Sequence, residues 1–432
     1  MRYPWPIMRL LYSLFFYLFM PGLLLRLLWR SRRQADYRCH WRERFGFYGK
    51  RAPTPLLWVH AVSLGETRAA KPLIEGLLAA YPRHALLLTS MTPTGRNAGS
   101  AAYRDNARVV RAYLPYDAPD AARRFFRHFR PDFGVLLETE IWPNLLFAAK
   151  RQGVPVMLVN ARLSSRSARG YARIVKLARP AFACLRAVAA QERADARRLA
   201  FLGATRVFVC GNLKFDARPD PELLARGKVW RAEILGAGAR PIWLAASTRE
   251  GEEALLLDVA ARLPACLPPG APPPLLVLTP RHPQRFDAVA ALVEARGLAL
   301  ARRGDGLPTP ETQVWLGDSM GELAAYYALA DVAFIGGSLL PLGGQNLIEA
   351  AACACPALFG PHTFNFARAS LDAVRSGAAL RVGDAKSLQE ALAALFAHPE
   401  RQAAMRVAAL AFAAQYQGAT TRILAFLREE AR

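Results

Sequence analysis

Carboxylates that directly follow apolar, strand-like runs are the side chains best suited to chemistry in the first half of this chain. The clearest is Glu66, which ends the segment HAVSLGE (60–66) and opens a helical pattern that continues to about residue 81. Ser63 and Gly65 lie in the turn of this strand–turn–helix unit. Because the start of a helix carries partial positive charge, we expect Glu66 to stay ionised and to serve as a base or an anion at the strand end. The alternative is a helix-terminal charge with no chemical role.

A second pair of carboxylates follows another apolar run, in ETEIWPN (138–144). Glu138 and Glu140 are two positions apart, so they point to the same side if the chain stays extended after the strand. Like charges this close raise each other's pKa and are tolerated mainly where a cation or a substrate compensates them. The pair is therefore a candidate for binding or catalysis.

Two further turns of the first half carry candidates. Lys214, in GNLKFD (211–216), follows the last strand-like run and is expected at a cleft between two domains, where its ammonium group would meet a departing phosphate. The alternative for Lys214 is a solvated linker lysine. Thr94 and Gly95, in TSMTPTG (89–95), form another polar turn after a strand, to which the pattern alone assigns no role.

Three turns of the second half each follow a predicted strand and suit a phosphate or a nucleotide. TPRHP (279–283) supplies an arginine, which grips phosphate with a planar fork, and a histidine donor, although such a pair is more often plain surface. GDSMGE (317–322) is also an ordinary way to begin a helix, but its amides would face a nucleotide. GGSLLPLGGQNLIEA (336–350) has glycines on both sides of a loop, which let backbone amides approach a phosphate, and a glutamate one turn into the next helix for ribose hydroxyls. Together, at successive strand ends, they predict one nucleotide-binding edge.

Strand-like runs alternate with helical patterns along most of the chain, which is typical of parallel, doubly wound α/β sheets. At 432 residues the chain exceeds one ordinary core, so two Rossmann-like domains facing a cleft are expected. The predicted strands are residues 56–60, 85–89, 109–114, 133–137, 154–159, 187–190 and 207–210, and then 241–246, 275–278, 314–316, 332–335, 357–359 and 378–381. The expected segments are an N-terminal membrane anchor (1–30), a first domain (31–215), a linker (216–240), a second domain (241–405) and a C-terminal helical segment (406–432) that packs back on the first domain.

The composition describes a folded and strongly basic protein. Hydrophobic residues make up 53% and charged residues 21%, which excludes a disordered chain. The net charge of +23 comes mostly from arginine, and such a surface attracts nucleic acid, acidic lipid headgroups or phosphorylated substrates. Nucleic acid is the weakest of the three, because the sequence has no basic tail, zinc-finger spacing or aromatic RNA-binding signature. The six cysteines are scattered in mostly apolar contexts and are expected to be reduced core residues without a metal.

The N-terminus carries an almost wholly apolar segment, residues 10–25, flanked by Arg9 and Arg26. A bilayer span needs about 20 apolar residues, a length reached if residues 27–29 join the segment and Arg26 extends its charge to the headgroups. The Pro-Gly pair at 21–22 would instead favour a kink or a helix in the interface. We expect a membrane anchor, with spanning favoured over lying flat. Because more arginines follow the segment, the rest of the chain is expected on the cytoplasmic side.

Taken together, these motifs resemble the Kdo transferases, which move 3-deoxy-D-manno-octulosonic acid (Kdo) from its cytidine monophosphate ester to a lipid A precursor. The resemblance covers essentially the whole chain, and the ordered set of motifs is specific although each is modest alone. One departure is Gln345, which stands where the family usually has a histidine. The matching segments are HAVSLGE (60–66), TSMTPTG (89–95), ETEIWPN (138–144), GNLKFD (211–216), TPRHP (279–283), GDSMGE (317–322) and GGSLLPLGGQNLIEA (336–350), after an anchor and an ERFGF connector (43–47).

The resemblance implies an inverting GT-B glycosyltransferase that works without a metal ion or cofactor, with an acceptor domain followed by a donor domain. It implies that Glu66 is the general base, that Glu138 stabilises the transition state or orients Lys214, and that Lys214 and Arg281 meet the charge on the phosphate. The cytidine nucleotide would be held by Arg281, His282, Met320, Gly321, Glu322, Asn346, Leu347, Ile348 and Glu349. The candidates for acceptor or cleft contacts are Ser63, Gly65, Thr94, Gly95 and Glu140.

The partners implied are CMP-Kdo, an anionic lipid A precursor and the cell inner membrane, with no nucleic acid and no protein partner. One rival is a GT-B enzyme that uses a uridine-diphosphate sugar on a lipid acceptor, which requires a longer phosphate-binding loop. Another is a non-enzymatic, basic membrane scaffold. The combined presence of Glu66, the two ETE carboxylates, Lys214 and Arg281 argues against a scaffold, which has no need for that set.

Overall fold

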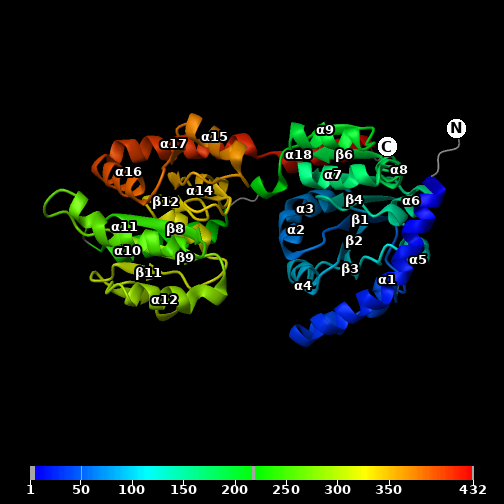
Figure 1. Ribbon diagram of the computed structural model, residues 1–432, viewed down its shortest axis with the longest axis horizontal. Coiled ribbons are helices and arrows are strands. Elements are labelled where there is room, and N and C mark those ends of the chain that lie inside the picture. The colour runs from blue at the N-terminus through cyan, green and yellow to red at the C-terminus, as the bar shows by residue number, and fades with distance from the viewer. Residues whose placement is uncertain (1–4, 50, 217–218, 237, 239, 431–432) are drawn as a thin grey trace. The chain divides into compact units, whose positions relative to one another are not determined.

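The computed structural model describes residues 5–49, 51–216, 219–236, 238 and 240–430. The chain forms two compact α/β units, one of residues 1–217 and 417–432 and the other of residues 218–416 (Figure 1). Over the described residues, each unit holds one parallel sheet of seven strands. The predicted class, doubly wound parallel α/β, is confirmed.

The first sheet has the strand order β3-β2-β1-β4-β5-β6-β7. Its strands are β1 (Leu56–His60), β2 (Ala85–Ser90), β3 (Val109–Tyr113), β4 (Phe133–Leu137), β5 (Val156–Ala161), β6 (Ala187–Ala190) and β7 (Val207–Val209). β2 pairs with one side of β1 and β4 with the other, so the chain changes direction across the sheet between them. Open α/β sheets bind their ligands at such a topological switch point, beyond the carboxyl ends of the strands.

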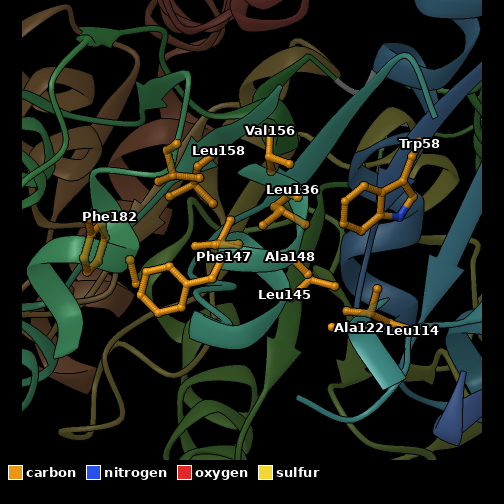
Figure 2. Close-up of a cluster of buried hydrophobic side chains, with 14 of the residues drawn as sticks. Trp58, Leu114, Ala122, Leu136, Leu145, Phe147, Ala148, Val156, Leu158 and Phe182 are labelled. Carbon is orange, nitrogen blue, oxygen red and sulfur yellow. The ribbon is translucent and has the colours of Figure 1, made fainter. Parts of the chain in front are cut away.

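Helices cover both faces of this sheet. They are α1 (Trp5–Arg33), α2 (Leu64–Ala69), α3 (Lys71–Ala80), α4 (Pro93–Ala102), α5 (Pro119–Phe129), α6 (Pro143–Arg151), α7 (Ser165–Arg173), α8 (Val175–Phe182), α9 (Arg193–Phe201) and α18 (Ala419–Glu430), with 3₁₀ turns η1 (Ala35–Arg38), η2 (Trp41–Phe45) and η3 (Leu213–Phe215). Because successive strand residues face opposite sides, Trp58 joins one core and Val59 joins the other. Figure 2 shows the first core, where strand residues such as Leu136 and Leu158 lie above side chains of α6 such as Leu145.

Trp58 anchors this first core. Its ring packs edge-on against Phe125 and Phe126 of α5, with centroids 5.0 and 5.7 Å away, and its Nε1 donates to Thr89 Oγ1 (2.8 Å). The neighbouring strand makes room with Gly134, where a Cβ atom would lie 2.3 Å from Trp58 Cε3. Adding a side chain there would overpack the core at a cost of about 1–3 kcal/mol.

The second sheet has the order β10-β11-β9-β8-β12-β13-β14, with its switch point between β8 and β12. Its strands are β8 (Ile242–Thr248), β9 (Leu275–Pro280), β10 (Leu300–Arg302), β11 (Val314–Leu316), β12 (Val332–Ile335), β13 (Ala357–Phe359) and β14 (Ala379–Arg381). The helices are α10 (Pro221–Leu235), α11 (Glu252–Arg262), α12 (Phe286–Glu294), α13 (Leu323–Leu329), α14 (Leu347–Ala352), α15 (Ala367–Arg375), α16 (Ala385–Ala397) and α17 (Pro399–Tyr416), with 3₁₀ turns η4 (Leu263–Cys266), η5 (Pro283–Arg285) and η6 (Arg303–Asp305). The sequence pattern missed β10, an edge strand of only three residues, all of them half-buried.

The segment predicted as a linker, residues 216–240, contains the 15-residue helix α10 instead. Trp230 of this helix packs against Trp315 and Tyr326 of the second unit, with each ring centroid 5.5 Å away. The Asp-Pro composition that suggested a linker is a helix start, since Asp220 caps α10 with its side chain.

The C-terminal segment predicted to pack back on the first domain, residues 406–432, is divided between the two units. α17 belongs to the second unit, and α18 packs on the first, where Ile423 and Leu427 are fully buried beside α3. The physical reason is a break between the two helices at Gly418, which has a φ of +90°.

Helix α1 lies along the outside of the first unit, beside α6 and α5 (Figure 1). Among the described residues, its segment Ile7–Arg32 is long and apolar enough to cross a membrane by length and composition. The basic connector that follows is folded onto the unit: Glu43 in η2 accepts hydrogen bonds from Arg96 (2.6 Å) and from the Tyr113 backbone N–H (2.8 Å).

Candidate active site

Polar side chains gather at the carboxyl edge of the first sheet, on both sides of its switch point. β1 leads to Glu66 in the first turn of α2, and β4 is followed directly by Glu138. β7 is followed by η3, which carries Lys214. The fold therefore brings three predicted residues, far apart in sequence, to one edge of one unit.

Glu66 helps Ser63 to cap the start of α2. Its carboxylate accepts hydrogen bonds from the Val62 backbone N–H (2.8 Å) and from Ser63 Oγ (3.3 Å), and Ser63 Oγ accepts the Glu66 N–H (3.4 Å). The helix-terminal role that the sequence left open is thus real. The Glu66 carboxylate can still accept further hydrogen bonds, because its two oxygens offer about four acceptor positions.

Burial raises the pKa of Glu66 to about 7; the Val62 N–H opposes this shift, and the charges of Glu138 and Glu140 add to it. With this pKa, Glu66 is only partly ionised at neutral pH, which differs from the expectation that the helix start keeps it ionised. A carboxylate that titrates near neutral pH is well matched to general base catalysis, since it is both partly ionised and more basic than an exposed one.

Glu138 and Lys214 form an ion pair, with Lys214 Nζ 2.9 Å from Glu138 Oε1. Their side chains are 24% and 48% exposed, so the pair adds about 1 kcal/mol or less to stability. Glu138 also has a left-handed backbone conformation (φ +59°), a costly state for a residue with a side chain that is frequent at functional sites. Lys214 is thus paired with a carboxylate although about half of its side chain is exposed, and its catalytic role stays a prediction.

The chain does not stay extended after β4, so the condition on which Glu138 and Glu140 were expected to point to the same side is not met. The backbone turns at Glu138, and Glu140 accepts a hydrogen bond from Trp142 Nε1 (2.7 Å). Burial raises the pKa of Glu140; the Trp142 hydrogen bond opposes this, and the charge of Glu138 adds to it. The three carboxylates still act on one another electrostatically.

Asn160, which sequence reasoning missed, connects the segments of Glu138 and Lys214. Its Oδ1 accepts the Leu213 N–H (3.0 Å), and the Glu138 N–H donates to the carbonyl of the residue before Asn160 (3.0 Å). Asn160 is fully buried with a φ of +52°, and its Nδ2 has no hydrogen-bond partner within the described part of the chain. The available signal was an asparagine directly after an apolar run, because asparagine tolerates the left-handed conformation.

Of the four residues predicted in turns at this edge, two have a structural role and two do not. Ser63 caps α2, and Gly95 is buried where a Cβ atom would lie 3.1 Å from the Ser63 carbonyl carbon, so it lets α4 approach the loop of Glu66. Gly65 and Thr94 are exposed, and the atom nearest to a Cβ at Gly65 is 4.0 Å away. Packing does not explain these two, and their contact with an acceptor stays a prediction.

In the second unit, the predicted nucleotide residues follow β9, β11 and β12, whose carboxyl ends share one edge of the sheet. Arg281 and His282 are exposed directly after β9. Asn346 caps α14 by accepting the Ile348 N–H (3.1 Å), and its amide donates to Glu349 Oε1 (3.1 Å). Although part of the Glu349 side chain reaches solvent, burial of its carboxyl group raises the pKa, against the Asn346 hydrogen bond and the charge of Arg281. Arg281 and Glu349 thus belong to one electrostatic site.

The remaining predicted nucleotide contacts differ in how open they are. The side chains of Leu347 and Ile348 are buried, so contact with a nucleotide would have to use their backbone. In the loop 317–322, Met320 is 61% exposed and Gly321 has a φ of +87°, which leaves the tip of the loop open.

Glu322, by contrast, is engaged by the chain itself. Its carboxylate accepts hydrogen bonds from Arg226 (3.0 Å), Arg303 (3.3 Å) and Ser319 Oγ (2.5 Å). The predicted helix start in this loop is also displaced, since α13 begins only at Leu323. Glu322 therefore shapes the loop, and its contact with a nucleotide stays a prediction.

The first part of the glycine-rich loop after β12 is occupied by a carboxylate of the same unit. Glu252, fully buried at the start of α11, accepts the backbone N–H groups of Gly337 (2.6 Å), Ser338 (3.0 Å) and Leu339 (3.0 Å). The expectation that these amides approach a phosphate is therefore wrong, which leaves the helix start at Asn346 for that role. Sequence reasoning did not single out Glu252, because nothing local shows that it turns inward.

The cysteines are all free thiols. The expectation of six core cysteines is wrong for Cys39 and Cys266, which are exposed, whereas Cys210 and Cys355 are buried. Within the described ranges, no group of three or more His, Cys, Asp or Glu side chains is arranged to hold a metal ion. Catalysis without a metal stays a prediction.

Comparison with known proteins agrees with the geometry. A family model described as 3-deoxy-D-manno-octulosonic-acid transferase (kdotransferase) matches residues 39–217, which include Glu66, Glu138 and Lys214. The chain is 46% identical to the 3-deoxy-D-manno-octulosonic acid transferase of Bordetella pertussis over 413 residues, 93% of this chain and 95% of that protein. It is 37% identical to the enzyme of the same name from Haemophilus influenzae over 404 residues, 92% and 93% of the two chains.

A solved structure of similar fold is the UDP-GlcNAc 2-epimerase of Neisseria meningitidis, with a TM-score of 0.58 at 15% identity over 87% of this chain and 99% of that one. At this identity the likeness concerns the fold alone, and it supports the expected GT-B architecture of two Rossmann-like units. The two transferases, in contrast, match almost the whole chain at identities that define a family. The chain belongs to the 3-deoxy-D-manno-octulosonic acid (Kdo) transferases and is a glycosyltransferase of GT-B fold.

Proposed function

We propose that this enzyme transfers Kdo from CMP-Kdo to a hydroxyl group of the lipid A precursor lipid IVA, in lipopolysaccharide inner-core biosynthesis. Transfer inverts the anomeric carbon and uses neither a metal ion nor another cofactor. The observation that carries the proposal is Glu66, a half-buried carboxylate with a pKa near 7 that lies at the switch point with the Glu138–Lys214 pair. The family relationship supplies the sugar.

Glu66 is the base of the proposed reaction. It takes the proton of the acceptor hydroxyl as the new bond forms between the acceptor oxygen and the anomeric carbon of Kdo. The bond from that carbon to the CMP phosphate breaks, and the electron pair leaves with CMP. A base whose pKa lies near the working pH contributes about 10²–10⁴-fold to such a step.

The neighbouring charges have separate proposed roles. Lys214 stabilises negative charge that develops on the departing phosphate, and Glu138 holds its ammonium group in place through the 2.9 Å ion pair. In the second unit, Arg281 and the capped start of α14 bind the CMP phosphate, and Glu349 accepts ribose hydroxyl groups.

We also infer that the enzyme works at the cell inner membrane with both units on the cytoplasmic side. The exposed apolar residues of α1 and the net charge of +23 support association with a membrane that presents anionic lipid. The acceptor is itself an anionic glycolipid, so a basic surface would help to capture it.

The test is transfer from CMP-Kdo to a tetraacylated lipid A precursor in the presence of EDTA, with products read by mass spectrometry. We expect the mass of one or more Kdo units on the acceptor and an equivalent release of CMP. Glu66→Gln should abolish transfer while CMP binding, measured by calorimetry, stays near the wild-type value. Glu75→Gln, which changes a 55% exposed carboxylate on α3, is the matched control and should leave the rate unchanged.

Two results would contradict the proposal. Full activity of Glu66→Gln would remove this residue from the mechanism. Failure of CMP-Kdo to serve as donor, together with transfer from a uridine-diphosphate sugar, would favour the rival glycosyltransferase.

A further inference from the structure

One face of α1 is an exposed apolar stripe. Successive residues of an α-helix are rotated by about 100°, so positions 7, 11, 14, 18 and 25 share a face. They are Ile7, Leu11, Leu14, Leu18 and Leu25, whose exposed fractions are 53–73%. Leu10 and Phe15, on either side of the stripe, are 68% and 59% exposed. So many large apolar residues in a row mark a surface that a partner or a membrane covers.

The opposite face of α1 is polar and docked on the first unit. Arg9 Nε donates to Asn144 Oδ1 (2.9 Å), and Tyr12 donates to Asp117 Oδ2 (2.9 Å). Ser13 Oγ accepts the Asn144 side-chain amide (3.1 Å) and is buried. One turn further along, Tyr17 donates to a carboxylate at the start of α5.

The receiving groups are part of the fold of the first unit. Asp117 is buried, and besides Tyr12 it accepts the backbone N–H groups of Asn144 (3.1 Å) and Leu145 (2.8 Å) at the start of α6. Asn144 is fully buried and donates to the Asp117 carbonyl (2.9 Å). If α1 left the unit, the buried groups that cap and begin α6 would lose their hydrogen bonds with Arg9, Tyr12 and Ser13.

Docking continues near the other end of the helix. Leu27 and Ser31 are 6% and 5% exposed, and Arg38 Nε, from η1, donates to Ser31 Oγ (3.1 Å). From Arg9 to Ser31 the helix extends about 33 Å at about 1.5 Å per residue, while the hydrocarbon core of a bilayer is about 30 Å thick. A spanning α1 would therefore carry buried, hydrogen-bonded carboxylate and amide groups of the first unit into hydrocarbon, at a large free-energy cost.

We propose that α1 does not cross the membrane but lies in the plane of its surface, with the stripe Ile7–Leu25 in the outer acyl region and the polar face held by Asp117 and Asn144. The partner is an anionic bilayer. Exposed arginines at one end of the helix (Arg26 and Arg30) suit its headgroups. This placement reverses the spanning anchor favoured by the sequence. It rests on the proposed membrane association and not on the transferase chemistry.

The depth of labels along the stripe tests the proposal. Leu11, Leu18 and Leu25 are replaced one at a time by cysteine in the full-length chain after its six native cysteines have been replaced, and each is spin-labelled. The protein is bound to vesicles of phosphatidylethanolamine and phosphatidylglycerol, and depth is measured by paramagnetic quenching. A label at Val407, which is 71% exposed on α17, is the control and should stay in water.

A helix that lies flat places the three labels at equal depth within about 3 Å. A spanning helix places Leu18 deepest, by about 10 Å relative to its two neighbours seven residues away. That profile, a steady gradient from Leu11 to Leu25, or no entry of any label into the bilayer would each overturn the proposal.

Protease accessibility gives an independent reading in inverted inner-membrane vesicles. An N-terminal epitope tag should be removed by added protease, because the start of α1 stays on the side of the catalytic units; protection of the tag would contradict a flat helix. Both measurements need no substrate, so failure of the transferase assay and failure of this proposal are distinguishable.

Discussion

Glu66, Glu138 and Glu140 share one sheet edge, where the charge of Glu138 helps to raise the pKa of the other two. Burial is the largest influence on Glu66 and Glu140, and it raises the pKa of both. Glu138 is instead paired with Lys214. At this edge one glutamate, Glu66, has a pKa suited to a base at neutral pH, and another, Glu138, is the partner of a cation. Different surroundings thus give neighbouring carboxylates different roles.

The pH dependence of transfer should report Glu66. The base must be ionised to act, and its pKa is about 7, so kcat/KM should fall about tenfold per pH unit well below 7 and level off above it. Lys214→Met removes the cation paired with Glu138, which leaves the carboxylates less compensated, so the acidic limb should move to higher pH. Lys71→Met, at an exposed ion pair on α3, is the control that should leave the limb in place. An acidic limb below pH 5 would contradict the assignment.

Asn160 should matter through its hydrogen bond to Leu213. Asn160→Gly keeps the left-handed conformation but leaves a buried N–H unpaired, so we expect a loss of about 1–3 kcal/mol in the free energy of unfolding. Asn160→Ala should lose about 1–2 kcal/mol more, because alanine is strained at this φ. Denaturant unfolding of both variants measures the difference. Equal stabilities of the two variants would show that backbone strain is not part of the effect.

At the scale of elements, the loops that follow the central strands of the two sheets differ in how accessible they are. In the first unit the loops after β1 and β4 leave Glu66 and Glu138 partly accessible. In the second unit, Glu252 of α11 accepts three backbone N–H groups of the loop after β12 and so fixes the loop to that helix. Phosphate binding in this unit therefore stays a prediction for the loop before β12, around Met320, and for the start of α14 at Asn346.

Glu252→Gln should loosen this loop. A glutamine side chain has one acceptor oxygen, so at least one of the three N–H groups of Gly337, Ser338 and Leu339 loses its partner, at a cost of about 1–3 kcal/mol. Hydrogen exchange of these three amides should become faster. Glu250→Gln, at a position that is 86% exposed in the same segment, should change stability by less than about 0.5 kcal/mol. Unchanged exchange rates in Glu252→Gln would show that the conformation of the loop does not depend on the Glu252 carboxylate.

At the scale of the whole molecule, the first unit is completed by the end of the chain. α18 follows the entire second unit in sequence, and its residues Ile423 and Leu427 belong to the core that also contains Val59 of β1. Residues near the C-terminus therefore contribute to the stability of the unit that carries Glu66.

Leu427→Ala should lower the free energy of unfolding of the first unit by about 2–5 kcal/mol, because it removes a fully buried side chain from a packed core. Leu410→Ala on α17, where the side chain is 50% exposed, is the matched control and should change stability by less than about 1 kcal/mol. Thermal unfolding followed by tryptophan fluorescence measures both. A small effect of Leu427→Ala would mean that α18 is not part of the first core in solution.

The sequence by itself determined the features that depend on neighbours along the chain. The apolar runs that became β1 and β4, the capping residues Ser63 and Asn346, and the ordered motifs that mark the family are all local, so periodicity and spacing were enough to find them. The edge strand β10 and the helix α10 were missed because their local patterns are weak or shared with linkers.

Only the tertiary structure decided the contacts and the burial. Lys214 and Glu138 are 76 positions apart, and Glu252 and Gly337 are 85 apart, so no window of sequence shows that they meet. Burial raised the pKa of Glu66 although the Val62 N–H and Ser63 oppose the shift, because desolvation depends on every segment packed around the carboxylate. The flat placement proposed for α1 likewise depends on Asp117 and Asn144, more than 100 positions away, which bind one face of a helix whose composition alone favours a span.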